Sequence, residues 1–133
     1  RRAAEAEVKR DLSAYLVAYL KALRTRNDRV PDLVRYSTPR MHASDRDAIA
    51  RMRRENVEFR GDPRLRLGKI SFTSDRVATL RLCEFDSAAR FVDLDTGRLV
   101  EPVFDRWEPY VVRLVKKENR WRVDQYTERP VPC

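Results

Sequence analysis

Residues 65–126 decide the fold, and they contain LRLGKISF (65–72), VATLRLCEF (77–85), WEPYVVRLVK (107–116) and RWRVDQY (120–126). These runs are rich in β-branched and aromatic residues, and polar turn residues separate them, which is typical of strands. In the second run Ala78, Leu80 and Leu82 share one face, because side chains alternate along a strand with period two. We therefore expect a sheet over residues 64–129.

The connections between these runs are short, and they predict antiparallel pairing. The turn Lys117-Glu118-Asn119 places asparagine where left-handed geometry is tolerated. A short apolar run at 90–93 leads to Asp95-Thr96-Gly97, where glycine supplies the positive φ of a tight hairpin. Parallel neighbours would need a crossover of roughly a dozen residues. The segment therefore predicts a strongly curved antiparallel sheet.

Residues 1–60 have the pattern of helices. Over residues 1–26, apolar residues recur at spacings of three and four, which predicts one long amphipathic helix. The apolar stripe consists of Val8, Leu12, Tyr15, Leu16, Tyr19, Leu20 and Leu23. Residues 31–36 predict a second, short helix that begins at a proline and has Asp28 as its N-cap.

A third helix is expected over residues 46–56, after a loop at residues 37–39. Ser44 or Asp45 is expected as its N-cap, and Gly61-Asp62-Pro63 separates it from the sheet. Helices at one end and strands at the other define an α+β architecture. The prediction is one domain over residues 1–133, with a long N-terminal helix and two short helices packed on the sheet.

The chain of 133 residues is basic, with 29 Lys and Arg against 21 Asp and Glu and a formal net charge of +8. Its arginines are scattered beside acidic residues and form no stripe with aromatic partners, which disfavours nucleic acid as a partner. A positive field also attracts anionic surfaces such as membrane headgroups or cell-wall polymers, and this partner class stays open. No run approaches the ~20 apolar residues of a membrane span. Because the chain opens abruptly at Arg1-Arg2, we expect that a leader or anchor precedes it.

Residues that bind metals and nucleotides are scarce. The two cysteines and the single histidine, His42, lack the spacing of a metal-ligand set. The chain has only three glycines, at positions 61, 68 and 97, and they form no glycine-rich loop for a nucleotide. The sequence therefore predicts neither a metal nor a cofactor.

Three motifs are similar to those of a known fold family: Cys83 followed by Asp86, the hairpin Asp95-Thr96-Gly97, and Trp121-Arg122-Val123. With the order of elements, they resemble the nuclear transport factor 2-like (cystatin-like cone) superfamily over nearly the whole chain. The resemblance is greatest to its extracytoplasmic, lipoprotein-borne or membrane-anchored members from actinobacteria. It implies that the first helix lies in the concave face of a bent sheet, and that this domain belongs to a secreted or membrane-anchored protein.

Cys83 and Cys133 are the only cysteines. In the extracytoplasmic setting that the resemblance implies, their even number favours a disulfide between them. Closing this loop of ~50 residues stabilises a fold by roughly 3–4 kcal/mol in the chain-entropy model. The alternative is a buried free Cys83 and an unpaired Cys133 in a frayed tail.

Enzymes of this superfamily, such as its ketosteroid isomerase-like and polyketide cyclase-like members, use the interior of the cone. Their chemistry requires a carboxylate base in an apolar pocket and a donor such as tyrosine to hold a developing oxyanion. The candidates here are Tyr15 and Tyr19 from the first helix, with Asp86, Asp93 or Asp124 from the sheet. Each has a structural alternative, because tyrosines also fill cores and aspartates near turns bond their own backbone.

The leading hypothesis is a non-catalytic domain that binds a ligand or a protein, or that serves in assembly. An aromatic surface could pair the sheet face with a second copy of the chain or with another envelope protein. Its candidate residues are Phe104, Trp107, Tyr110 and Tyr126. The alternative is that these rings fill the core.

The rival hypothesis is a small isomerase or dehydratase that acts on an apolar ligand. A dry pocket in which an aspartate faces Tyr15 or Tyr19 favours this enzyme. A cone filled by Leu16, Leu20, Leu80 and Trp121 excludes it.

Overall fold

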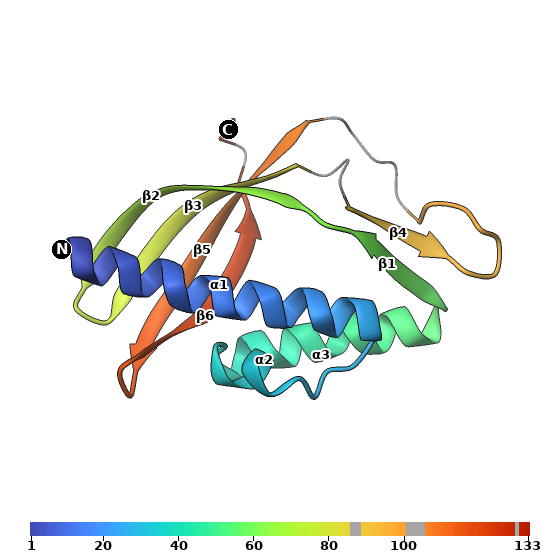
Figure 1. Cartoon of the computed structure of the whole chain (residues 1–133), viewed down its shortest axis with the longest axis horizontal. Coiled ribbons are helices and arrows are strands. Elements are labelled where there is room, and N and C mark those ends of the chain that lie inside the picture. The colour runs from blue at the N-terminus through green and yellow to red at the C-terminus, as the bar shows by residue number, and fades with distance from the viewer. Residues whose placement is uncertain (86–88, 101–105, 130) are drawn as a thin grey trace.

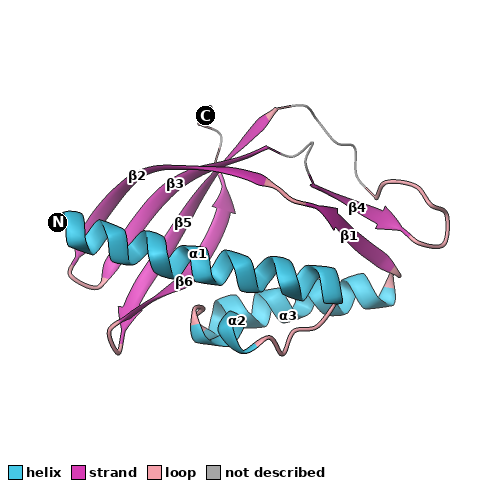
Figure 2. Cartoon of the chain, in the orientation of Figure 1, coloured by secondary structure: helices cyan, strands magenta, loops and turns pink. Residues whose placement is uncertain are grey.

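The computed structural model describes residues 1–85, 89–100, 106–129 and 131–133. Its helices are α1 (Arg2–Thr25), α2 (Pro31–Arg35) and α3 (Pro39–Arg54), and its strands are β1 (Val57–Gly61), β2 (Arg64–Ser74), β3 (Val77–Phe85), β4 (Ala89–Asp93), β5 (Trp107–Lys117) and β6 (Arg120–Glu128). The helices lie together on one side of the strands (Figures 1 and 2). This arrangement confirms the predicted α+β class.

The main sheet has the strand order β2-β3-β5-β6, and each neighbouring pair is antiparallel. Leu80 lies opposite Val112, and Leu114 lies opposite Val123. These side chains and Trp121 are buried, and α1 crosses the face that they form (Figure 1). The predicted inward face of the second run is therefore confirmed.

Register shifts bend this sheet, and one of them lies between Phe72 and Ser74. The register shifts between Leu67 and Ile70, where Gly68 approaches β3 so closely that an added Cβ would lie 3.0 Å from the carbonyl oxygen of Arg81. A further shift lies between Arg113 and Leu114 in the β5–β6 pair. Bulges increase the local twist and bend a strand. The sheet consequently curves around α1, which leaves room between the two.

A second, two-stranded sheet was not predicted. The helical part was predicted to extend to residue 60, but Val57–Gly61 forms β1, which pairs antiparallel with β4. Phe59 lies opposite Phe91, and their rings are 5.1 Å apart. A strand of five residues is too short to show its period clearly. The expected hairpin after β4 is present, with Gly97 at a φ of 73°.

The third helix begins seven residues before the predicted start. Thr38 is its N-cap, with a side chain that accepts a hydrogen bond from the backbone N–H of Met41 at 3.4 Å. Pro39 occupies the first turn, where its missing N–H has no cost. Of the predicted loop at residues 37–39, Pro39 therefore belongs to the helix, while Ser37 and Thr38 precede it. Ser44 and Asp45 are not caps but lie inside the helix.

The predicted cap of the second helix is also wrong. Val30 precedes Pro31 at this helix start and makes no side-chain capping hydrogen bond. The backbone oxygen of Asp28 instead lies 3.2 Å from Nε2 of His42 on α3. This contact holds the loop between α1 and α2 against α3.

A disulfide joins Cys83 on β3 to Cys133, with their Cα atoms 6.0 Å apart. This is the pairing that sequence analysis favoured over two free thiols. Among the residues that the structure describes, no helix is both long and apolar enough to cross a membrane.

Candidate functional site

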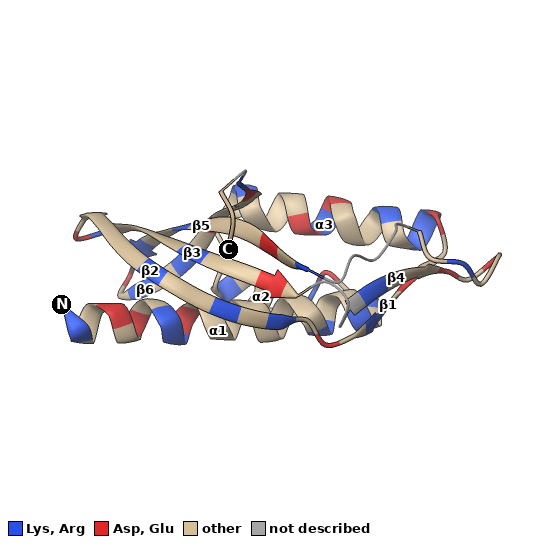
Figure 3. Ribbon diagram, turned by 90° about the horizontal axis from the view of Figure 1, so that it is seen from above, with Lys and Arg blue, Asp and Glu red and all other residues tan. Residues whose placement is uncertain are grey.

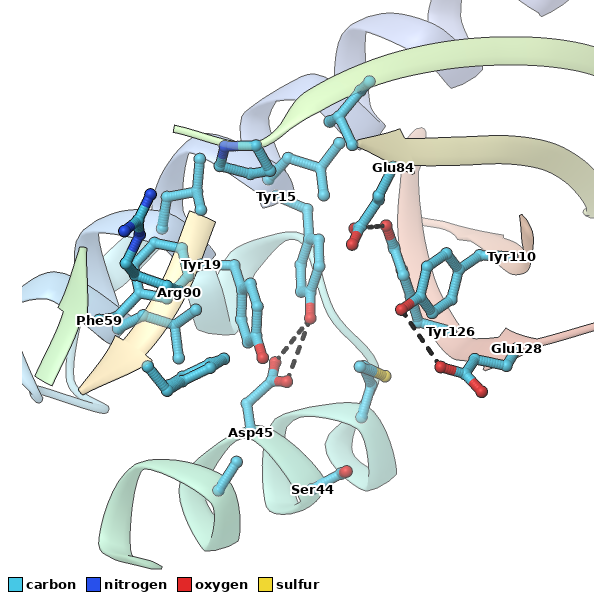
Figure 4. A pocket seen from close by; sticks show the side chains of 18 residues that line it. Tyr15, Tyr19, Ser44, Asp45, Phe59, Glu84, Arg90, Tyr110, Tyr126 and Glu128 are labelled. Carbon is cyan, nitrogen blue, oxygen red and sulfur yellow. Dashed lines mark hydrogen bonds between the residues drawn. The ribbon is translucent and has the colours of Figure 1, made fainter. Parts of the chain in front are cut away.

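A cavity of about 440 Å³ lies between α1, α3 and the two sheets. Its wall is mostly aliphatic and aromatic, and its aromatic residues are Tyr15, Tyr19, Phe59, Phe91, Tyr110 and Tyr126. Carboxylates come from three different elements: Asp45 on α3, Glu84 on β3 and Glu128 on β6. Figure 4 shows these side chains around the cavity.

The most buried polar pair in the wall is Asp45 with Tyr15. The Tyr15 hydroxyl donates to both carboxylate oxygens of Asp45, at 2.9 and 3.1 Å. The exposed fraction of Asp45 is 3%. Burial raises the pKa of Asp45 from 3.8 to about 6, although the Tyr15 hydrogen bond and the nearby His42 oppose the change. No described Lys, Arg or His forms an ion pair with this carboxylate.

Tyr19 adds a second hydroxyl beside this pair. Its ring stacks on that of Tyr15, with centroids 5.8 Å apart, and its hydroxyl points toward Asp45 (Figure 4). Burial and the negative charge of Asp45 both raise the pKa of Tyr19. The two tyrosines therefore stay protonated and act only as hydrogen-bond donors or acceptors near neutral pH.

A second polar group lies on the sheet side of the cavity. The Tyr126 hydroxyl donates to Glu84, and burial, followed by the charge of Glu84, raises the pKa of Tyr126. The Tyr110 hydroxyl lies 3.5 Å from Oε1 of Glu128, and its ring packs on Tyr126 at 5.2 Å. The cavity thus has a carboxylate–tyrosine pair on each of two opposing walls.

The candidate aspartates from sequence analysis lie elsewhere. Asp93 is not in the cavity wall, because its Oδ1 accepts hydrogen bonds from the backbone N–H groups of Asp95 and Thr96 in the hairpin turn. Asp86 lies outside the described residues. Among the described residues that were candidates for an enzyme site, Tyr15 and Tyr19 line the cavity, and Asp93 and Asp124 do not.

Asp124 holds the helices to the sheet and does not face the cavity. It accepts hydrogen bonds from Thr38, Arg40 and Arg113. Burial alone would raise the pKa of Asp124, but these three hydrogen bonds and the charge of Arg40 outweigh it and hold the pKa below its ordinary value. The carboxylate is therefore a structural anion that is already fully paired.

The aromatic residues considered for an interface are divided between the two faces of the sheet. Tyr110 and Tyr126 line the cavity. Trp107 does not, and packs instead on Phe85, with Arg66 4.2 Å above its ring. Phe104 lies outside the described residues. A homodimer through the sheet stays a prediction, with Trp107 as its remaining aromatic candidate.

Basic and acidic residues are interspersed over helices and strands alike (Figure 3). Many arginines are paired, including Arg24 with Asp62 and Arg51 with Glu55. Arg29, Arg46 and Arg53 gather around a shallow hollow beside α3. Pairing of this kind interrupts a continuous basic stripe, and the argument against nucleic acid as a partner stays a prediction of the sequence.

Asp45 and Glu84 line the cavity but were not predicted as site residues. Asp45 belongs to a stripe with Met41, Ile49 and Met52 at helical spacing, but this stripe is visible only if the helix begins at Pro39. Glu84 follows Leu82 at the next inward position of β3. Extending the two apolar patterns by one position would have found both residues.

No protein-family model and no curated protein matches this sequence. Similar solved structures exist, and one is the intermembrane space region of the chloroplast protein ARC6, at a TM-score of 0.71 and 13% identity over 90% of this chain and 92% of that chain. The chain has the nuclear transport factor 2-like fold. A ketosteroid isomerase-like protein from Erwinia carotovora atroseptica shares it, at a TM-score of 0.54 and 16% identity over 91% of each chain.

A candidate scytalone dehydratase from Novosphingobium aromaticivorans is also similar, at a TM-score of 0.54 and 14% identity over 98% of this chain and 93% of that chain. At these identities the likeness extends to the fold alone. The function of this chain must therefore be argued from its own cavity.

Proposed function

We propose that this chain is an extracytoplasmic domain that binds a small, largely apolar ligand in the cavity between α1, α3 and the sheets. The observation that carries the proposal is the buried carboxylate of Asp45, which faces the cavity and has no described ion-pair partner. The cavity volume of about 440 Å³ also falls within the range of roughly 300–1,000 Å³ that is usual for ligand sites.

The shape of the core supports a ligand site. Leu80 and Trp121 are buried in the sheet core, as a filled cone would require. Leu16 and Leu20, in contrast, are only partly buried and line the cavity. Helix α1 therefore presents apolar side chains to a space that the protein itself leaves open.

Two observations support the extracytoplasmic location. Disulfides persist in oxidising compartments and are rare in the cytosol, and Cys83 is joined to Cys133. The similar region of ARC6 is named for an intermembrane space. Attachment to the cell envelope and an actinobacterial origin remain predictions of the sequence.

Filling the cavity is expected to abolish ligand binding. The probe is N-phenyl-1-naphthylamine, a neutral apolar dye whose fluorescence rises in apolar sites. Leu20→Trp places an indole in the cavity, so we expect at least a roughly tenfold loss of dye affinity. Val17→Trp is the matched control, because Val17 lies on the same helix but is 70% exposed. Equal dye binding by both variants, or none by the wild type, would contradict the proposed function.

A second candidate function is proton transfer on a ligand held in the same cavity. The specific observation is that Asp45 has a pKa raised to about 6 beside Tyr15, which is the arrangement that the enzyme hypothesis required. A base of this pKa works near neutral pH. Because Tyr15 already donates to the base, Tyr19 is the hydroxyl available to hold an oxyanion.

This second function predicts turnover of a β,γ-unsaturated ketosteroid to its conjugated isomer. Asp45→Asn is expected to reduce the rate by roughly 100-fold or more, because it removes the base. The reaction is followed by the ultraviolet absorbance of the conjugated ketone. Dye binding without turnover by the wild type would leave the non-catalytic function as the correct one.

A further inference from the structure

The cavity has the opposite charge to the rest of the chain. The protein carries a formal charge of +8, yet its described cavity wall holds Asp45, Glu84 and Glu128 against a single basic residue, Arg90. Arg90 is an exposed residue of β4, and its guanidinium points away from Asp45 (Figure 4). The described lining is therefore net negative although the chain is net positive, with Asp45 buried, Glu84 half-buried and Glu128 exposed.

Asp45 in particular forms no ion pair with a described residue, and the charge of nearby His42 offsets its burial only in part. A buried ionised carboxylate is costly unless it is paired, and the Tyr15 hydroxyl supplies hydrogen bonding but no positive charge. The raised pKa of Asp45 reflects this cost, and at pH 7 the group is still mostly ionised. A ligand that carried a positive charge to this carboxylate would remove the cost on binding.

The aromatic walls favour the same kind of ligand. The faces of aromatic rings attract cations, and cages of aromatic residues with carboxylates recognise organic ammonium groups. Tyr15 and Tyr19 lie side by side next to Asp45, and Tyr110 and Tyr126 lie next to Glu84 and Glu128. Each carboxylate in the described cavity wall thus lies next to a tyrosine ring.

We propose that the ligand of this cavity is an organic cation, namely a protonated amine on an apolar body, whose ammonium group pairs with Asp45. The proposal rests on the function proposed above and specifies its ligand class. The apolar body lies against Leu16, Leu20 and the tyrosines of the sheet side. Glu84 contributes a second negative charge across the cavity, and it does so while it accepts the hydrogen bond from Tyr126.

Other ligand charges fit less well. An anion would meet three carboxylates, and a neutral molecule would leave Asp45 without an ion-pair partner. A bare metal ion needs several ligands on one centre, and the described residues contain no group of three or more His, Cys, Asp and Glu side chains that could hold one. A protonated amine can pair with the carboxylate of Asp45 and also contact the faces of the aromatic rings in the cavity wall.

The experiment compares three probes with one carbon skeleton: 3-phenylpropylamine, 3-phenylpropan-1-ol and 3-phenylpropanoate. Affinities are measured by isothermal titration at pH 7.5 and 0.15 M salt. We expect the amine to bind at least roughly tenfold more tightly than the alcohol, and the acid to bind most weakly. The global charge of +8 acts against this order, so general electrostatic attraction cannot produce it.

Two variants locate the effect. Asp45→Asn is expected to reduce the affinity for the amine to the level of the affinity for the alcohol. The affinity for the alcohol itself should stay within about twofold of the wild-type value. Asp47→Asn is the matched control, because Asp47 is exposed on the same helix and does not line the cavity. It is expected to bind all three probes as the wild type does.

The outcomes separate this inference from the proposed function. Equal affinity for amine and alcohol, or a preference for the acid, would overturn the cation assignment, while binding of the neutral dye would keep the ligand-binding function. Amine selectivity that survives Asp45→Asn would also overturn it. Failure of the wild type to bind the dye and all three probes would overturn both.

Discussion

Replacing Asp45 with asparagine is expected to raise the free energy of unfolding at pH 7 by roughly 2–3 kcal/mol. Asparagine keeps the size of the side chain and can accept the hydrogen bond that Tyr15 donates to Asp45. It removes a buried charge that forms no ion pair with a described residue. The change is measured by urea denaturation of the wild type and the variant.

The pH dependence of this effect has a defined sign. Because the pKa of Asp45 rises from 3.8 to about 6 on folding, the folded protein keeps a proton over a range in which the unfolded chain has released it. The contribution of Asp45 to the free energy of unfolding therefore falls as pH rises from 3.8 to about 6, and is constant above that. The gain from Asp45→Asn should be below about 1 kcal/mol near pH 4 and complete by pH 7.

Taking the difference between variant and wild type isolates Asp45. Asp124, whose lowered pKa has the opposite effect on acid stability, is present in both proteins and cancels. Asp47→Asn, on the exposed face of α3, should change the free energy of unfolding by less than about 0.5 kcal/mol at every pH. A loss of stability in Asp45→Asn, or a gain that does not vary between pH 4 and 7, would show that Asp45 is not a destabilising buried charge.

Removal of the disulfide is expected to lower the free energy of unfolding by roughly 3–4 kcal/mol. The bond joins residues 50 positions apart, so it restricts a large part of the unfolded chain. The double variant Cys83→Ala, Cys133→Ala removes the bond without leaving a free thiol. Its chemical denaturation midpoint is compared with that of the oxidised wild type.

Reduced wild-type protein is the control for the double variant. Both lack the bond, so their free energies of unfolding should agree within about 0.5 kcal/mol. If reduction leaves the wild-type midpoint unchanged, the bond does not stabilise the fold. An intact mass two protons higher than expected for the oxidised chain, in protein prepared without reductant, would show that the bond had not formed.

The sheet was predictable because its patterns are long and local. The runs of β3, β5 and β6 alternate with period two, and short polar turns join β2 to β3 and β5 to β6. Glu118 and Asn119 both have a positive φ, which agrees with the turn that the asparagine predicted at this place. Local geometry of this kind is determined by a few adjacent residues.

The small sheet and the start of α3 were not predictable in the same way. The five residues of β1 are stabilised by pairing with β4, which lies more than 25 positions further along the chain. The extension of α3 to Pro39 is anchored by Asp124 on β6, which accepts hydrogen bonds from Thr38 and Arg40. Such distant contacts override local preferences.

The candidate site depends on the same distant contacts. Tyr15 and Tyr19 were found because they lie on a long, regular helical stripe. The sequence pattern predicts Asp45 as a cap because it places the start of this helix at residue 46, whereas α3 begins at Pro39. The pairing of Tyr15 with Asp45 joins residues 30 positions apart, and the bond between Tyr126 and Glu84 spans 42. Neither separation is visible in a local pattern.

The position of the disulfide also determines how the domain would respond to mechanical force. Cys133 is bonded to β3, which lies inside the main sheet between β2 and β5. A pull applied at Cys133 therefore enters the sheet at an interior strand and does not peel the edge strand β6 away one hydrogen bond at a time. While the bond is intact, the covalent path of the load runs from Cys133 directly to Cys83 on β3 and bypasses β6. Reduction would transfer the load to β6 and lower the force needed to open the sheet.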